Sequence, residues 1–170
     1  MDTPVPPVDA VAPVQDDARI LRDEVQTLEE MLSLIRDDDQ QEADFLPVLD
    51  HVRHFFLADL MQHMHEEEQV FFPAVQQQLP QGYWKMVRLR QEHQQLREAI
   101  EQFRSALALE SYLGPQAKQQ HLWRLVNEAR GILALLKTHA AFEIELAHQI
   151  GQLTPPPTAG AAPPRSEPQG

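Results

Sequence analysis

The sequence contains no cysteine among its 170 residues. Disulfides, thiolate zinc sites, iron–sulfur clusters and cysteine nucleophiles are therefore excluded, and any metal ion must be bound by histidine, aspartate or glutamate. Positive charge is also scarce, because the 26 acidic residues outnumber the 14 lysines and arginines and give a formal charge of −12. Nucleic acids and anionic membranes bind clustered positive charge, so neither is an expected partner.

Long apolar runs are absent as well. No segment approaches the roughly 18 apolar residues of a membrane span. The N-terminal residues MDTPVPPVDA lack the basic start and the apolar core of a signal peptide. We therefore expect a cytoplasmic location.

Proline is concentrated near the two ends of the chain. Four of the 14 prolines precede residue 14, and six follow residue 154, in low-complexity sequence with little apolar surface to bury. We therefore predict disordered tails at residues 1–15 and 153–170, and one domain at residues 16–152.

Glycine is scarce between the predicted tails, and apolar residues recur every three or four positions without a strand pattern. Breaks are expected at residues 36–44, 78–84 and 110–116, with a kink at Pro73. The predicted helices span about 16–38, 44–72, 81–111 and 116–151. Because short connections make consecutive helices antiparallel neighbours, the sequence predicts an all-α, up-down-up-down antiparallel four-helix bundle.

Each predicted helix carries an apolar stripe, and polar residues interrupt three of the four. The polar positions are His63 and Glu67 in the second stripe, which ends at Val70, then His93 in the third, and His139 and Glu143 in the fourth, which also contains Leu135. The first stripe contains Val25 instead. This residue aligns with His93 when LRDEVQTLEE (21–30) is compared with its near repeat LRQEHQQLRE (89–98).

Histidine and glutamate are four residues apart in two of the stripes. Four residues turn a helix by about 400°, so each pair lies on one face, one turn apart. Counted from the helix ends at 1.5 Å per residue, the interrupted positions fall within roughly one turn of a common plane. We therefore expect one cluster formed by His63, Glu67, His93, His139 and Glu143.

A metal ion is the simplest partner for such a cluster. Carboxylates that face a low-dielectric core cost several kcal/mol each unless they are neutralised, and the inward stripes contain no lysine or arginine. Imidazole together with carboxylate suits iron, manganese or zinc, and facing helices of bundles build dinuclear centres from such ligands.

The segments HMHEEEQVFFP, LRQEHQQL and LLKTHAAFE resemble the hemerythrin-like HHE cation-binding domain over roughly residues 16–151. The resemblance implies a non-haem di-iron site, with iron preferred to manganese or zinc. It implies that His63 and His139 are terminal ligands, Glu67 and Glu143 bridging carboxylates, and His93 the lone ligand of the third helix. It also implies a small partner, namely O2, NO or peroxide, or a role in iron handling, and it assigns no catalytic residue.

Val25 occupies the place of the first histidine of that family, and three arrangements are open. The site holds two irons, one of them a ligand short; or Glu29 or Glu66 replaces the missing ligand; or only one ion is bound. Glu66 and Glu68 otherwise read as a solvated acidic face. The alternative function is a degenerate, metal-poor bundle that serves as a structural or protein-interaction module.

Overall fold

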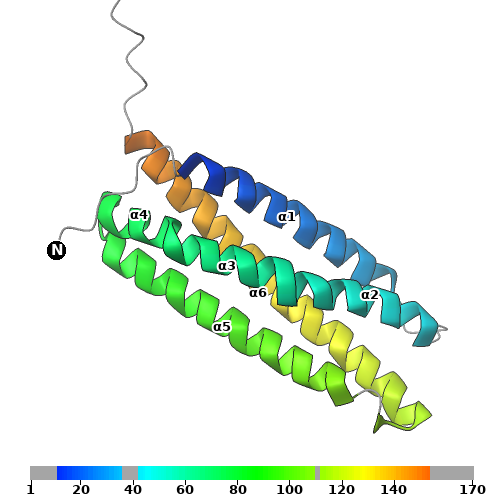
Figure 1. Ribbon diagram of the computed structural model, residues 1–170. Coiled ribbons are helices and arrows are strands. Elements are labelled where there is room, and N and C mark those ends of the chain that lie inside the picture. The colour runs from blue at the N-terminus through cyan, green and yellow to red at the C-terminus, as the bar shows by residue number, and fades with distance from the viewer. Residues whose placement is uncertain (1–10, 36–41, 110–111, 154–170) are drawn as a thin grey trace, which may run out of the picture.

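The computed structural model describes residues 11–35, 42–109 and 112–153, which are almost entirely helical and include no strand. The helices lie side by side in an elongated bundle (Figure 1). In chain order the elements are α1 (Val11–Leu34), α2 (Glu42–His54), the π-helical turn η2 (Phe55–Asp59), α3 (Leu60–Gln69), α4 (Phe71–Gln78), α5 (Gly82–Leu109) and α6 (Pro115–Leu153). The prediction of an all-helical bundle is therefore confirmed.

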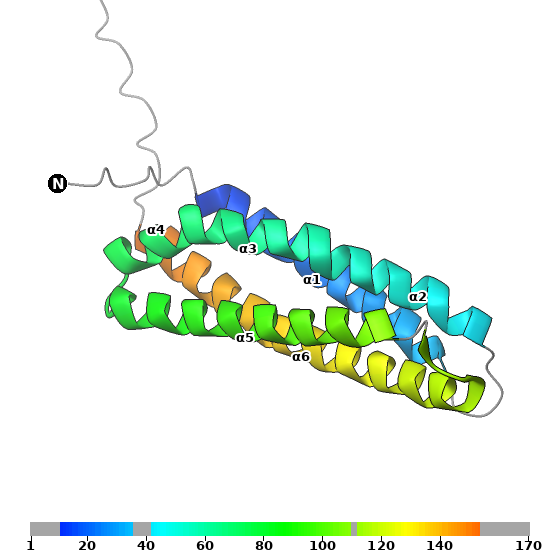
Figure 2. The same ribbon diagram turned by 60° about the horizontal axis from the view of Figure 1, so that its bottom comes forward.

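The second predicted helix is a rod of four successive elements, α2, η2, α3 and α4 (Figure 2). The kink expected at Pro73 lies earlier, at Val70, whose φ of −118° ends α3. A proline ring clashes with the carbonyl group four residues before it, which here belongs to Gln69. The helix therefore breaks one turn ahead of the proline. Pro73 then falls in the first turn of α4, where its missing N–H costs nothing.

The π-helical turn η2 was not expected from the sequence. Phe55 and Phe56 at its start are both buried, at 3% and 0% exposure. Consecutive residues of an α-helix point about 100° apart, whereas a π-turn fits an additional residue into the turn. The wider turn thus allows two adjacent aromatic side chains to face the core.

The core consists of two apolar clusters at different levels of the bundle. On α5, His93 lies between Leu89 of one cluster and Leu96 of the other. Glu67 on α3 lies in the same way between members of the two clusters. A polar layer therefore crosses the bundle, enclosed by apolar side chains on both sides.

Two residues assigned to the inward stripes are instead at the surface, so the prediction was wrong for them. Val70 is 36% exposed because it lies at the break between α3 and α4, and Leu135 is 43% exposed. The buried face of α6 includes Leu133 and Leu136, and Leu135 points about 100° away from Leu136.

The start of α1 and the end of α6 lie at the same end of the bundle (Figure 1). The first helix begins at Val11, inside the segment that the sequence assigned to a tail, and α6 ends at Leu153. The remaining tail residues fall outside the described residues, so the tails and the domain limits stay predictions. No described helix combines the length and apolar character that crossing a membrane requires.

Gly82 has close backbone neighbours at the point where α4 and α5 meet. A Cβ atom there would meet the carbonyl oxygens of Val75 and Gln76, the latter at 2.6 Å. We expect Gly82→Ala to lower the free energy of unfolding of the metal-free protein by about 2–3 kcal/mol, because the two helix ends must move apart.

Gly131 of α6 provides the matched control, since a Cβ atom there would have nothing within 4 Å. Gly131→Ala is expected to raise the free energy of unfolding by about 0.5–1 kcal/mol, because alanine restricts the unfolded chain. Chemical denaturation measures both changes. Effects of the same sign in the two variants would contradict the packing described at Gly82.

Candidate metal centre

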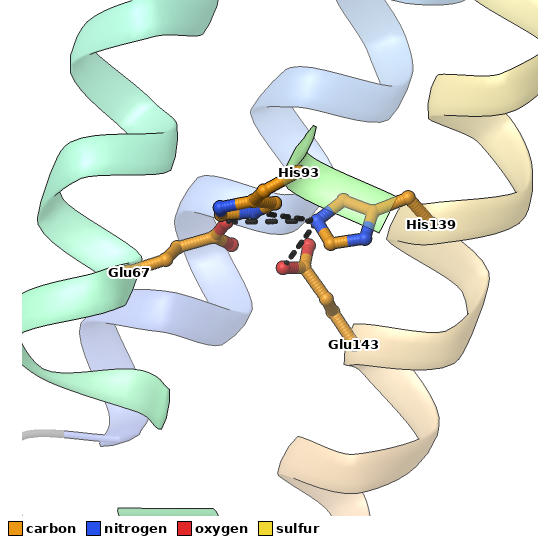
Figure 3. A group of neighbouring side chains, drawn as sticks. All are labelled: Glu67, His93, His139 and Glu143. Atoms are coloured by element: carbon orange, nitrogen blue, oxygen red, sulfur yellow. Dashed lines mark hydrogen bonds and ion pairs between the residues drawn. The ribbon is translucent and has the colours of Figure 1, made fainter. Parts of the chain in front are cut away.

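Four buried side chains meet in the polar layer: Glu67 of α3, His93 of α5, and His139 and Glu143 of α6 (Figure 3). One potential ligand atom from each residue lies within 4.8 Å of those from the others. Metal–ligand bonds of about 2.0–2.2 Å place the donor atoms around one ion within roughly 4.4 Å of one another. The group therefore has nearly the dimensions of a coordination shell.

His63, the fifth residue predicted for the cluster, lies at its edge. Its Nε2 atom is 2.9 Å from Oε1 of Glu67, and its side chain is 13% exposed. It is not among the four residues whose ligand atoms are mutually close. His63 thus reaches the group through Glu67, on a side that is accessible from the surface.

Several contacts in the group are short but lack hydrogen-bond geometry. Nε2 of His139 lies 2.8 Å from Oε1 of Glu143. Even so, neither oxygen of Glu143 has a hydrogen-bond partner among the described residues, and the same holds for Oε1 of Glu67 and Nε2 of His63. A buried polar atom without a partner costs about 1–3 kcal/mol. These atoms are placed as donors around a cation would be.

The two buried histidines turn the same ring atom toward the centre. Their Nε2 atoms are 3.1 Å apart. The Nδ1 atom of His93 is 2.9 Å from Oε1 of Glu68, and that of His139 is 2.9 Å from Oε2 of Glu92. A carboxylate accepts the Nδ1 proton, so each neutral ring presents an Nε2 lone pair to the centre. Two such lone pairs repel each other unless a metal ion, or in its absence a proton on one of the rings, lies between them.

Glu68 and Glu92 contact the two buried histidines, and sequence reasoning missed both contacts. Glu68 was assigned to a solvated acidic face, but its side chain is only 26% exposed and contacts His93. Glu92 is 19% exposed and contacts His139. The available signal was position, because each glutamate is adjacent in sequence to a predicted ligand and lies about 100° around the helix, toward a neighbouring helix.

The two buried carboxylates differ in their protonation. Burial, together with repulsion from Glu67, raises the pKa of Glu143 to about 8. Burial acts in the same direction on Glu67, but contacts from His139, His63 and His93 outweigh it and hold the pKa of Glu67 well below its usual range. In the metal-free protein near neutral pH, one carboxylate is therefore ionised and the other largely protonated.

The histidines respond to these carboxylates. Burial lowers the pKa of His139, but contacts with Glu143 and Glu67 outweigh burial and raise this pKa well above its ordinary value. The pKa of His63 is raised for similar reasons, chiefly by Glu67. Protons therefore occupy ligand groups of the metal-free site, and a metal ion must displace them.

The structure does not bring the two proposed substitute ligands into the four-residue group. Val25 is 1% exposed and belongs to an apolar cluster. Glu29, one turn further along α1, pairs with Lys137 at 2.9 Å. Glu66 is exposed and accepts a hydrogen bond from Gln62. The position that Val25 leaves without a ligand is therefore not filled by either carboxylate.

A surface pocket of about 390 Å³ lies beside His63. Its lining combines apolar and polar side chains, namely Ile20, Leu21, Glu24, Phe55, Asp59, Gln62, His63 and Glu66. His63 is the one residue of the predicted cluster that lines it, so the pocket connects the surface to the edge of the site.

An all-helical bundle whose buried layer contains paired histidines and glutamates has the character of a metal-binding protein. A family model for the Hemerythrin HHE cation binding domain matches residues 11–150. The chain therefore belongs to the hemerythrin HHE family, as its motifs indicated. A search of curated proteins found no match, and neither did a search of solved structures.

Proposed function

We propose that this protein binds iron, one or two ions per chain, and that the bound iron binds or reacts with O2, NO or peroxide, or is handled as cargo. The proposed ligands are His63, Glu67, His93, His139 and Glu143. The observation that supports this most is the pair of Nε2 atoms 3.1 Å apart, next to buried carboxylate oxygens without partners. A cation would satisfy all of these groups at once.

The donor set supports iron as the metal. Imidazole nitrogen and carboxylate oxygen together suit iron, manganese and zinc, whereas calcium and magnesium prefer oxygen alone. Family membership supports a cation in general. Manganese and zinc are therefore the competitors that a metal analysis has to separate from iron.

The number of ions depends on what lies at each of the two carboxylate oxygens of Glu67. Its Oε2 atom lies 3.2 Å from Nε2 of His93, within the four-residue group, which supports one firmly held ion. Its Oε1 atom faces His63, and Val25, which takes the place of the first histidine of the family, has no donor atom. A second ion at that side would have fewer protein ligands, and its remaining positions would be open to small molecules.

Bound iron with an open coordination position would supply the ligand-binding and redox chemistry. The chain itself orients the donors and excludes water. Phe72 is fully buried and packs on the ring of His93, with ring centroids 4.7 Å apart. The pocket at His63 supports access for a small ligand.

We also propose the up-down-up-down order of the four helical rods. In Figure 1 the colour runs along successive helical rods in alternating directions, which supports the up-down-up-down order. The cytoplasmic location and the absence of nucleic-acid and membrane partners stay predictions from the sequence.

The competing function is a metal-poor bundle used as a structural or protein-interaction module. The buried polar atoms without partners argue against it, because they cost free energy when no metal ion is bound.

Metal content tests the proposal directly. Protein reconstituted anaerobically with Fe²⁺ and then desalted is expected to hold between about one and two irons per chain, and to develop near-ultraviolet charge-transfer absorption in air. Iron below about a tenth per chain, with manganese and zinc equally low, would favour the metal-poor module instead. Zinc retained in place of iron would refute the identity of the metal only.

A further inference from the structure

Two similar chains of contacts lead from the protein surface to the buried histidines. In the first, Nη2 of Arg97 lies 2.7 Å from Oε1 of Glu68, and the same oxygen lies 2.9 Å from Nδ1 of His93. In the second, Nε of Arg88 lies 2.7 Å from Oε1 of Glu92. The other oxygen of Glu92 lies 2.9 Å from Nδ1 of His139. Each histidine is thus held by a carboxylate, and each carboxylate by an arginine.

The two chains connect successive helices of the site. Glu68 follows the buried Glu67 on α3 and reaches across to His93 on α5. Glu92 precedes His93 on α5 and reaches across to His139 on α6. The helix that supplies one group of the cluster therefore also supplies the carboxylate that orients the next histidine. The position of each imidazole is thereby tied to the packing of two helices.

The arginines are themselves anchored. The guanidinium group of Arg88 lies over the ring of Phe142, 3.7 Å from its centroid. Arg97 is only 32% exposed at its side chain. Contact with an arginine favours the ionised form of a carboxylate, which accepts hydrogen bonds and donates none. Glu68 and Glu92 are therefore suited to accept the Nδ1 protons of the two buried histidines.

His63 has no such arrangement. Its Nε2 atom contacts Glu67, but the described residues place no carboxylate on its Nδ1 atom. It also lines the surface pocket. Of the three histidines of the cluster, His93 and His139 have a carboxylate at Nδ1, and His63 has none among the described residues.

We propose that Glu68 and Glu92 are positioning residues of the metal site, which hold His93 and His139 with Nε2 directed at the ion. This inference rests on the proposed function. An ionised carboxylate at Nδ1 fixes the tautomer and the ring orientation, and it makes Nε2 a stronger donor to the metal. Loss of such a partner lowers metal affinity by about 10- to 100-fold.

The test uses the full chain with Zn²⁺ and Co²⁺ as probes. Zn²⁺ affinity is measured by competition with a chromophoric chelator, and the Co²⁺ complex by its visible absorption. Glu68→Gln and Glu92→Gln are each expected to weaken Zn²⁺ binding by about 10- to 100-fold and to shift the Co²⁺ bands, because the amide keeps the size of the side chain but loses its charge. Glu68→Ala, which loses the acceptor altogether, is expected to bind more weakly than Glu68→Gln.

Glu128→Gln is the matched control. Glu128 is 31% exposed and accepts a contact of 2.7 Å from Arg124, as Glu68 does from Arg97, but no contact with a histidine is found for it in the described part of the chain. We expect unchanged Zn²⁺ affinity and unchanged Co²⁺ bands in this variant. A thermal melt of each metal-free variant confirms that it is folded.

The outcomes separate the two proposals. If the unaltered chain binds Zn²⁺ and Co²⁺ but Glu68→Gln and Glu92→Gln bind them equally well, with unchanged bands, the positioning role is refuted and the metal site stands. If the two variants change only the melting temperature and match Glu128→Gln in Zn²⁺ affinity and Co²⁺ bands, the carboxylates are ordinary structural ion pairs and the inference is refuted. If the unaltered chain binds no metal, both proposals fail.

Discussion

Replacing His93 by alanine is expected to lower the affinity for Zn²⁺ by about 150- to 5000-fold, because removing one partner of a buried charged group costs roughly 3–5 kcal/mol and each 1.4 kcal/mol is about tenfold in affinity. His93 is fully buried, and its Nε2 atom lies 3.2 Å from Glu67 and 3.1 Å from His139. His93 is the residue that α5 supplies to the group, and it contacts both Glu67 of α3 and His139 of α6. The expected loss is therefore larger than that for the carboxylates behind the histidines.

Chelator competition with Zn²⁺ measures this change, with His65→Ala as the control. His65 belongs to α3, as His63 does, but it is exposed and lies on a different face of the helix. We expect His65→Ala to bind Zn²⁺ as the unaltered chain does. Equal affinities for the two variants would show that the buried group is not the metal site.

The metal-free protein is expected to lose stability as the pH rises from about 5 to 8. Glu143 has a pKa of about 8 in the folded chain against 4.5 as the reference for an unfolded chain. A group whose pKa is raised on folding stabilises the fold below its unfolded pKa, and this contribution disappears as the pH rises through the folded pKa. The loss from Glu143 alone is roughly 3–5 kcal/mol.

The two histidines with raised pKa values act in the same direction. Contributions from His139 and His63 are complete below their unfolded pKa of 6.5 and disappear as the pH rises through their higher folded values. Glu67 has the opposite sign: its lowered pKa gives a contribution that is present above 4.5 and is lost only in stronger acid. Maximum stability without metal is therefore expected in mildly acidic solution.

Metal binding should reverse this trend, because an ion displaces the protons held by Glu143 and the histidines. Urea denaturation between pH 5 and 9, with a chelator and with excess Zn²⁺, measures both curves. Glu143→Gln is expected to flatten the metal-free curve, since its amide does not titrate. A metal-free protein whose stability rises steadily from pH 5 to pH 9 would contradict the assigned protonation of the site.

The close approach of the site residues could be predicted from their spacing in the sequence. His139 and Glu143 are four residues apart, and the 3.6-residue period places them on one face whatever surrounds the helix. The level of His93 followed from counting along helices of known rise. Four of the five predicted residues meet within 4.8 Å, and His63 is attached through Glu67. Whether they bind a metal stays a prediction.

Other features depended on how the helices pack. Val70 was predicted to face inward, but the strain that Pro73 imposes on the preceding turn is relieved at Val70 and turns it outward. The π-helical turn at Phe55 widens one turn of the second rod, and no local signal in the sequence distinguishes it from an α-helical turn. Both features change the direction in which side chains point, although the second rod stays helical on either side of them.

The motifs of the sequence by themselves indicated the hemerythrin HHE family, which the matching family model shows. The sequence also determined that the chain is helical with its histidines and glutamates near one level, because helix period and rise are local properties. Only the tertiary structure decided which neighbours those residues have. A residue beside a ligand points about 100° away from it, toward water or toward another helix. For Glu68 and Glu92 the neighbour is a histidine of the next helix, and only packing between distant segments could place it there.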